Sequence, residues 1–400
     1  MKNIKTSNID KDAQSLAIIY TFPPYVDTSG NVFSKRIHEE IKDKITIITN
    51  KFISSPPMDD SLNELTSPYV TKRLEMQATF TYREWKYFND FIEQAYNAYL
   101  NEIKEGKIFR NLYSRSMSVI THLVAYKIKT HNPNIKWIAE FSDPILKEVD
   151  GNERNVEIPL SWLEDNLSLE NIKAFDNNQN LFFISELLVY LYADEIIFTN
   201  KIQKEFMLSY LKEKHFDINQ NHLLLKSISS RIKIKQHPTL PIEFYQKGKI
   251  KVDINKENIN LGYFGNFNIK RGISEFINAW KNLPKSKKTK SRLFIFTNMN
   301  SDKIYASIPE ELISYIKVEK SLKYLDYLGI LDSFDYVLSF DTQVSKIFGL
   351  NPYLPSKISD YLGANTKTLA LLEKNSPTDL ISNSKLVKQY IDNINLNTLF

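Results

Sequence analysis

The side chains best suited to bind a charged ligand lie in one short stretch near the end of the chain, residues 355–364. Pro355 and Ser356 form a helix-start signal, because proline is tolerated in a first turn and a serine hydroxyl can cap free backbone N–H groups. Lys357 and Asp360 follow within the next turn, where the helix dipole favours an anion. The hydroxyl and the ammonium predict a phosphate site, and the carboxylate can accept hydrogen bonds from a diol. The stretch therefore predicts contacts to the phosphates and ribose of a nucleotide; a helix that only caps itself is the alternative.

A second group of residues suited to phosphate lies earlier in the chain. The sequence has only ten glycines, and Gly265 and Gly272 bound a loop between a predicted strand and a predicted helix. Lys270 and Arg271 stand in this loop, where freed amides and two cations would suit a diphosphate. Neither GxGxxG nor a Walker P-loop is present, and the lysine cluster at 285–290 stands where a dinucleotide site needs an acidic residue. The loop thus predicts a diphosphate site of another kind.

Polar residues also follow the predicted strands of the first half. Gly30 lies in the loop after the apolar run 16–20, His122 comes shortly after a strand and a loop, and Asp143 follows the run 135–141. The carboxyl ends of parallel strands face the ligand crevice in α/β proteins, so these residues are candidates for a second site. The alternatives are a turn glycine, a structural histidine and a turn-forming aspartate.

Composition limits the class of protein. The 400 residues exceed one ordinary core, so two domains are expected, and 42% apolar with 25% charged residues is normal for a globular chain. No apolar run approaches the roughly 20 residues that span a bilayer, and the polar start is no signal peptide. The absence of cysteine excludes disulfides and thiolate metal sites and fits a reducing cytoplasm. We therefore expect a cytoplasmic protein.

Metal and nucleic acid have little support in the sequence. Asp10 and Asp12 form a DxD pattern, but it precedes the first strand, so we interpret it as a solvated tail, and the six histidines show no paired metal spacing. We expect no metal. The net charge of +5 is mild, and no basic stripe alternates with aromatic residues on one element, so nucleic acid is not an expected partner.

Strands and helices alternate in two sets, which predicts two doubly wound, Rossmann-like α/β domains facing a central cleft. The first domain, 1–245, would carry helical insertions near 55–105 and 150–180. The second domain would span 258–375, and a helical segment, 376–400, would pack back on the first domain. The predicted strands are 16–20, 45–49, 107–113, 135–141, 193–200 and 232–235 in the first half, and 261–264, 293–297, 315–318, 336–340 and 368–372 in the second.

Residues 355–367 resemble the P-S-K-x-x-E-Y-x-A-x-G-x-P motif of the GT-B glycosyltransferases of retaining family 4, in their bacterial surface-polysaccharide branch, with Asp360 in place of glutamate. The family glutamate binds the donor ribose, so the resemblance implies that role for Asp360. The loop from Gly265 and Asn266 to Arg271 resembles the donor-diphosphate loop of the family. It implies donor phosphates on this loop and on Lys357.

A second pattern of the same family lies in the first half. The stretches 114–122 and 137–144 resemble S-R-S…H followed by W-V-A-D-F-R-D-P. We expect the first domain to hold the acceptor, with His122 and Asp143 acting in catalysis and Gly30 and Arg115 contacting the acceptor.

Together these features predict an enzyme, a glycosyltransferase that moves a sugar from a nucleotide-diphosphate sugar to a glycan or lipid-linked acceptor. The resemblance implies retained anomeric configuration, no metal, a UDP-sugar as co-substrate with no other cofactor, and synthesis of bacterial cell-surface polysaccharide or glycoconjugate. Peripheral contact with the inner membrane face would follow from a lipid-linked acceptor. The alternative is a non-catalytic nucleotide-sugar or glycan binding subunit, because Pro352 stands where many members carry a second acidic residue and Asn266 where many carry arginine.

Overall fold

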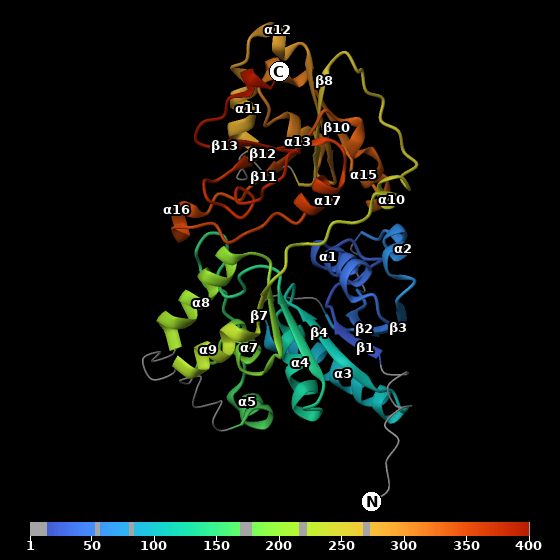
Figure 1. Cartoon of the computed structure of the whole chain (residues 1–400), viewed down its shortest axis with the longest axis vertical. Helices are drawn as coiled ribbons and strands as arrows, with labels where there is room; N and C mark the ends of the chain where they lie inside the picture. The colour runs from blue at the N-terminus through green and yellow to red at the C-terminus, as the bar shows by residue number, and fades with distance from the viewer. Residues whose placement is uncertain are drawn as a thin grey trace, which may run out of the picture. The chain divides into compact units, whose positions relative to one another are not determined.

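The computed structural model describes residues 14–52, 57–79, 84–168, 178–215, 222–266 and 273–399. The chain divides into two compact units, Met1–Gln236 and His237–Phe400, each built on one parallel sheet (Figure 1). The division falls before position 245, where the sequence placed the end of the first domain. The reason is that α10 (Ile242–Tyr245) belongs to the second unit, where the Tyr245 hydroxyl donates to the backbone oxygen of Asp360 at 2.8 Å. Within the described residues no helix combines the length and the apolar character needed to cross a membrane.

The first unit contains a seven-stranded sheet in the order β3-β2-β1-β4-β5-β6-β7, in which every neighbouring pair is parallel. The predicted apolar runs form its centre, and every residue of β2 is buried, as expected for a sheet covered on both faces. The strand order reverses between β1 and β4, so the carboxyl ends of these strands form a switch point, where α/β sheets bind ligands. The strands are β1 (Gln14–Ile18), β2 (Ile45–Asn50), β3 (Val70–Met76), β4 (Phe109–Arg115), β5 (Lys136–Phe141), β6 (Glu195–Phe198) and β7 (Ile232–Ile234).

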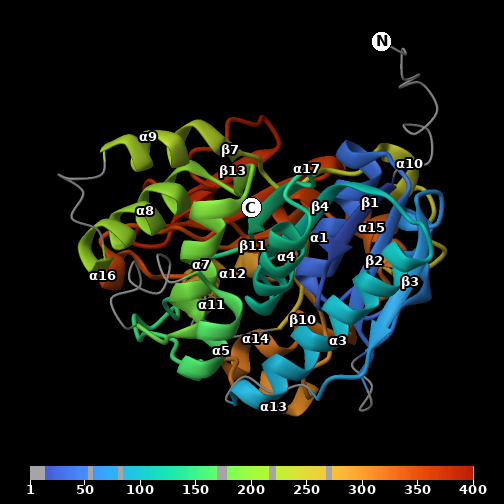
Figure 2. The same cartoon turned by 90° about the horizontal axis from the view of Figure 1, so that it is seen from below.

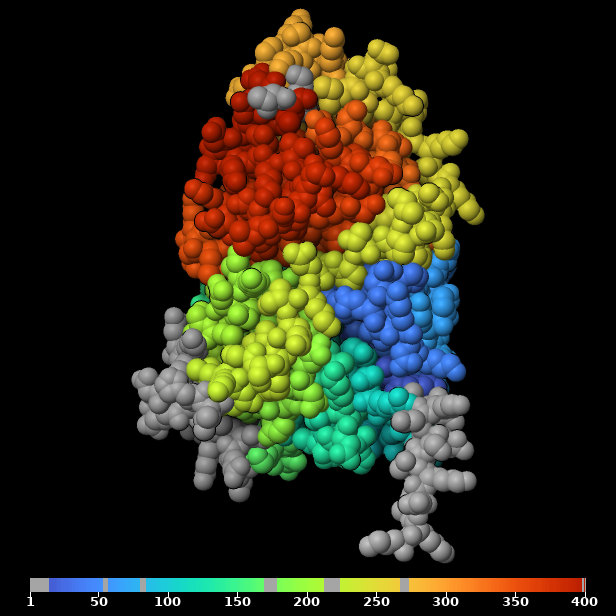
Figure 3. All heavy atoms as spheres, viewed as in Figure 1, coloured from blue at the N-terminus to red at the C-terminus, as the bar shows by residue number. Residues whose placement is uncertain are grey.

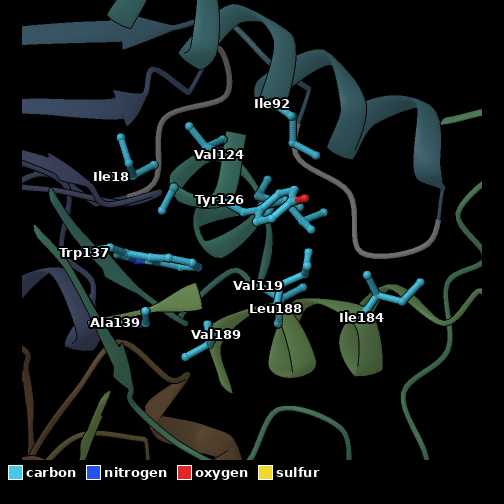
Figure 4. Packing of buried hydrophobic residues seen from close by; sticks show 14 of the residues in the cluster. Ile18, Ile92, Val119, Val124, Tyr126, Trp137, Ala139, Ile184, Leu188 and Val189 are labelled. Carbon is cyan, nitrogen blue, oxygen red and sulfur yellow. The ribbon is translucent and has the colours of Figure 1, made fainter. Parts of the chain in front are cut away.

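Helices cover both faces of this sheet. α3, α4 and α7 lie side by side over one face (Figures 1 and 2), and their apolar side chains pack against Ile18 and Trp137 of the strands (Figure 4). α1 covers the opposite face, where Phe33 packs with Ala17 and Ile47. The helices are α1 (Thr28–Arg36), which continues as a π-helical turn (Ile37–Ile41), a 3-10 turn (Asp60–Leu62), α2 (Asn63–Thr66), α3 (Trp85–Lys104), α4 (Ile120–His131), α5 (Leu160–Asn166), α7 (Leu181–Tyr192), α8 (Lys201–His215) and α9 (His222–Arg231).

The second unit contains a six-stranded parallel sheet in the order β10-β9-β8-β11-β12-β13, with its switch point between β8 and β11. Its strands are β8 (Ile259–Phe264), β9 (Ser291–Thr297), β10 (Ile316–Lys320), β11 (Tyr336–Phe340), β12 (Lys367–Leu372) and β13 (Leu386–Tyr390). Its helices, besides α10, are α11 (Ile273–Lys281), α12 (Lys285–Lys288), α13 (Ser301–Tyr305), α14 (Glu310–Ile313), α15 (Tyr324–Ile330), a 3-10 turn (Leu331–Ser333), α16 (Ser345–Phe348), α17 (Ile358–Gly363) and a 3-10 turn (Leu396–Thr398).

Two segments differ from the sequence-based expectation. The region 55–105, predicted as a helical insertion, also contains the edge strand β3, whose residues are mostly exposed or half-buried and carry several charges. The region 376–400, predicted as helix packing on the first domain, instead forms the edge strand β13 and a 3-10 turn, and Leu396 packs in the apolar core of the second unit. That prediction is wrong because the backbone of β12 offers an open edge, and five residues of β13 pair with it in parallel.

Candidate functional site

The start of α17 and the loop after β8 meet at the carboxyl end of β8 (Figure 1). The Lys357 ammonium donates a hydrogen bond to the carbonyl oxygen of Phe264, the last residue of β8. Gly265 has φ 133°, a conformation that L side chains rarely adopt, and a Cβ at this position would lie 2.6 Å from Lys357 Nζ. The glycine therefore makes the turn and leaves room for the ammonium. Two distant motifs, each predicted to contact phosphate, thus lie together at the switch point of the second unit.

The other residues predicted for the phosphate site have different outcomes. Asn266 is exposed at the same edge of the sheet, whereas Lys270 and Arg271 lie outside the described residues. The prediction that Ser356 caps the following helix is wrong: α17 begins later than the sequence indicated, and its N-cap is Lys357, without a side-chain cap. Lys357 is thus the residue of this stretch that the structure brings to Gly265, and the contact of Ser356 with phosphate stays a prediction.

Asp360 is 5% exposed, and tyrosines from elsewhere in the second unit surround it. Tyr324 and Tyr327 of α15 donate from their hydroxyls to Oδ1 and Oδ2 at 2.9 and 3.5 Å, and the Tyr245 hydroxyl donates to the backbone oxygen. Burial, and then the charge of Asp360, raise the pKa of Tyr324 and Tyr327 well above the ordinary value, so both phenols are donors at neutral pH. No sequence motif predicted this cluster, although the i, i+3 spacing of the two tyrosines places both on one helix face.

Glu373, directly after β12, organises the segment that follows β11. Its carboxylate accepts hydrogen bonds from the Ser345 backbone N–H at 3.1 Å and from Asn351 Nδ2 at 2.9 Å. The backbone N–H of Glu373 in turn donates to Asp341 at 3.1 Å, and burial raises the pKa of the Asp341 carboxyl to about 6. An acidic side chain thus holds the segment that leads to Pro352. It is Glu373, which follows β12, and not a residue at position 352 itself.

In the first unit, Gly30 lies at the start of α1. Its backbone N–H donates to Asp27 Oδ1 at 2.8 Å, so the N-cap aspartate uses the amide that the sequence suggested for a ligand. A Cβ on Gly30 would lie 2.4 Å from the carbonyl oxygen of Thr21, which shows why only glycine fits. Burial raises the pKa of Asp27, against the lowering effect of these backbone hydrogen bonds. Gly30 therefore secures the close approach of α1 to the loop after β1.

Arg115 ends β4 and is buried in an ionic cluster. It forms an ion pair with Glu140 of β5, and its Nε donates to the Ser29 hydroxyl at 2.8 Å. Arg36 of α1 donates to both oxygens of Glu140 at 2.9 and 2.8 Å. Burial alone would raise the pKa of Glu140, but the two arginines outweigh it and lower the value to about 2. Arg115, predicted to hold the acceptor, thus joins β4, β5 and α1 beneath the carboxyl edge of the sheet.

His122 has 0% exposure and lies inside the apolar core. Its Nδ1 is 2.8 Å from the Ser114 hydroxyl, which also accepts from Trp137 Nε1 at 2.8 Å, and its ring packs on Phe141 at 5.3 Å. Burial lowers the pKa of His122 to about 3, so the imidazole is neutral at physiological pH. No hydrogen-bond partner for Nε2 is found in the part of the chain that the structure describes. In this conformation no ligand reaches the ring.

Asp143 is exposed after β5, at the carboxyl edge of the first sheet. The neighbouring Ser142 N–H donates to the Ser116 hydroxyl at 3.0 Å, which ties the loop after β5 to the loop after β4. The structure therefore brings Asp143 to the edge where a ligand binds in α/β folds, but it places His122 in the core. No cluster of acidic or histidine side chains suited to a metal ion occurs within the described ranges.

Solved structures of similar architecture identify the fold. Sucrose-phosphate synthase from Thermosynechococcus elongatus matches with a TM-score of 0.60 at 12% identity, covering 96% of this chain and 88% of its own. The lipopolysaccharide outer core galactosyltransferase WaaB in its apo form (TM-score 0.49, 10% identity, 92% and 84% coverage) and S. aureus MnaA with UDP (0.49, 11%, 90% and 79%) are also similar. No protein-family description and no curated protein matches the sequence. The chain has the two-domain α/β fold of the GT-B type, as the sequence predicted.

Proposed function

We propose that this protein is a glycosyltransferase that moves a sugar from a nucleotide-diphosphate sugar to a glycan or lipid-linked acceptor. The observation that carries the proposal is the position of the Lys357 ammonium beside Gly265, at the switch point of the second sheet in a GT-B-type fold. A phosphate oxygen at this edge would replace the neutral carbonyl of Phe264 as acceptor, and a charge-assisted hydrogen bond is the stronger one. The donor would thus bind the second unit.

In the reaction, the bond between the anomeric carbon and the diphosphate oxygen breaks, and the anomeric carbon bonds to an acceptor hydroxyl that loses its proton. Negative charge grows on the departing diphosphate, and an ammonium fixed at that position stabilises it most effectively when it is already in place. Lys357 would supply this charge. The assignment of Asp360 to the ribose rests on the sequence resemblance alone, since its carboxylate accepts hydrogen bonds from Tyr324 and Tyr327 in this structure. A UDP-sugar donor, retention of configuration, independence of metal and a role in bacterial surface polysaccharide rest on that resemblance.

The first unit would hold the acceptor at the carboxyl edge of its sheet. Asp143 is exposed there, and it is the better of the two catalytic candidates for direct contact with an acceptor hydroxyl. His122 would act from the core, through the hydroxyl of Ser114 that it shares with Trp137. Gly30 and Arg115 would shape the edge by fixing α1.

Binding of nucleoside diphosphates to the full chain tests the proposal. Isothermal titration calorimetry with UDP, GDP and CDP should give one binding partner, and Lys357→Ala should weaken its affinity by about tenfold or more, since one hydrogen bond between charged groups is lost. Lys285→Ala is the matched control, because Lys285 is an exposed lysine of α12 and belongs to neither the loop after β8 nor the start of α17. Its affinity should equal that of the wild type.

Two results would contradict the proposal in different ways. If the wild type binds none of the three nucleotides, the donor site is wrong as a whole. If Lys357→Ala binds as tightly as the wild type, the phosphate lies elsewhere. If one nucleotide binds and Lys357→Ala weakens it, release of that nucleotide from its sugar donor distinguishes an enzyme from a non-catalytic binding subunit.

A further inference from the structure

We propose that the second unit has another binding site, for a small phosphorylated polyol, at the amino-terminal edge of its sheet. A cavity of about 430 Å³ opens there, within the roughly 300–1,000 Å³ of small-molecule sites. Its walls come from the segment before β8, which lies at the surface (Figure 3, yellow), and from the first residues of β9 and β10. Because β8, β9 and β10 are parallel, their amino ends share one edge. Lys357 and Gly265 lie at the other edge, so this cavity is separate from the proposed donor site.

Arg292, the second residue of β9, is the main cation of the cavity. Its Nη1 donates to the carbonyl oxygens of Thr289 and Ser291 at 2.9 and 2.8 Å, and its guanidinium lies 5.1 Å from the ring centre of Tyr315. These contacts fix the side chain. Its Nε and Nη2 have no hydrogen-bond acceptor among the described residues, so they remain available to a ligand. A guanidinium held with one edge open suits the paired oxygens of a phosphate.

The lining contains a second cationic side chain and carboxylates beside it. Lys317 of β10 adds a second positive charge, and Asp253 is the one acidic residue of the lining. Lys317 lies 2.8 Å from Glu319, but this ion pair is exposed on both sides, and such pairs contribute little. The lining therefore holds two cationic side chains, Arg292 and Lys317, and the Arg292 guanidinium is the one without an ion-pair partner among the described residues.

Asparagine side chains held in a fixed turn form another part of the lining. Asn260 donates from Nδ2 to the carbonyl oxygens of Asn255 and Asn258 at 3.0 and 2.8 Å, and Asn255 Oδ1 accepts the Glu257 N–H at 2.9 Å. Asn255 and Asn258 line the cavity. Each primary amide offers donors and an acceptor, which is the combination that neighbouring hydroxyl groups need. The lining thus combines the Arg292 guanidinium with primary amides, which suits a ligand with a phosphate and several hydroxyls.

Three ligands test the phosphate contacts and the hydroxyl contacts of the cavity separately: ribose 5-phosphate, inorganic phosphate and ribose. We expect ribose 5-phosphate to bind the full chain by calorimetry, with affinity at least about tenfold above that of inorganic phosphate, and ribose alone not to bind. The titrations are repeated with saturating UDP. The affinity for ribose 5-phosphate should not change, because the two sites lie at opposite edges of the sheet.

Arg292→Gln and, as a second variant with an exposed side chain, Lys317→Gln should each weaken ribose 5-phosphate about tenfold or more, while Lys285→Gln, outside the cavity, should not. Absence of ribose 5-phosphate binding would overturn the proposal. So would competition by UDP, or full affinity in both cavity variants. A failure of UDP, GDP and CDP alike to bind would refute the proposed function and leave this site intact.

Discussion

Two buried glutamates of the first unit should respond in opposite directions when each is changed to glutamine. Glu140 is 3% exposed and ion-paired with two arginines, which hold its pKa at about 2 although burial alone would raise it. Glu186 of α7 is 5% exposed, and its carboxyl Oε1 accepts a hydrogen bond from the Tyr190 hydroxyl at 2.8 Å. Burial raises the pKa of Glu186 to about 8. One carboxyl is thus kept charged by the fold and the other neutral.

The sign of each effect follows from proton linkage, starting from the ordinary glutamate pKa of 4.5. Glu140, with a lowered pKa, contributes stability that is present above pH 4.5 and is lost as the pH falls through about 2; at 1.36 kcal/mol per pH unit this amounts to about 3 kcal/mol. Glu186, with a raised pKa, costs stability as the pH rises from 4.5 through about 8. At pH 7 the unfolded chain has released this proton and the folded chain has not, so the cost is about 3 kcal/mol.

Equilibrium urea denaturation followed by circular dichroism measures both effects. At about pH 7, Glu140→Gln should lower the free energy of unfolding by about 3 kcal/mol, and Glu186→Gln, which keeps an acceptor for Tyr190, should raise it by a similar amount. The gain for Glu186→Gln should shrink toward about pH 5. Glu93→Gln is the control, because Glu93 is 43% exposed in its pair with Lys127 and should cost under about 1 kcal/mol. Destabilisation of equal size by both core substitutions would refute the charge argument and indicate general sensitivity of the core.

Three further outcomes follow from single contacts. The imidazole of His122 should stay neutral, with NMR chemical shifts that do not change between about pH 5 and 8, since burial holds its pKa at about 3; a midpoint near the ordinary value of 6.5 would contradict the buried position. Gly30→Ala should lower the melting temperature and cost more than about 1 kcal/mol, because the new Cβ would meet the Thr21 oxygen at 2.4 Å; an unchanged melting curve would refute that packing. Tyr324→Phe removes the 2.9 Å hydrogen bond to the Asp360 carboxylate and should cost about 1.5–3 kcal/mol in urea denaturation, whereas a loss below about 0.5 kcal/mol would argue against this bond.

The central strands of both sheets could be predicted because burial on both faces makes almost all of their residues apolar. Runs such as 45–49 and 368–372 are apolar without alternation, which in a parallel sheet happens where helices cover both faces. The edge strands β3 and β13 escaped prediction for a related reason. One side of each is open, so charged residues such as Lys72 and Lys388 are tolerated, and the backbone pairing with a neighbour decides the structure. The residue pattern of an edge strand does not indicate which strand will pair with it.

The candidate site also contains residues that could be predicted from the sequence and partners that could not. Gly265 and Lys357 could each be proposed from their own motif, and the common carboxyl edge of the sheet brings them together. The partners of the buried charges could not be proposed, because they come from distant elements: Arg36 is 104 residues from Glu140, and Tyr324 is 36 residues from Asp360. Sequence motifs identify the elements that meet at a site, whereas charge pairing across elements determines which groups remain open to a ligand.

That distinction bears on which unit would bind the nucleotide. In the first unit the features that suit an anion are already used within the protein, since the Gly30 amide donates to Asp27 and Arg115 is paired with Glu140. A phosphate there would have to displace a carboxylate, which gains little. In the second unit Lys357 is held beside Gly265 at the carboxyl end of β8, and a hydrogen bond from its ammonium to a phosphate oxygen is stronger than the one it makes to the Phe264 carbonyl. The charged donor is therefore expected on the second unit, and the edge of the first unit, with its serine hydroxyls and Asp143, suits the uncharged hydroxyls of an acceptor.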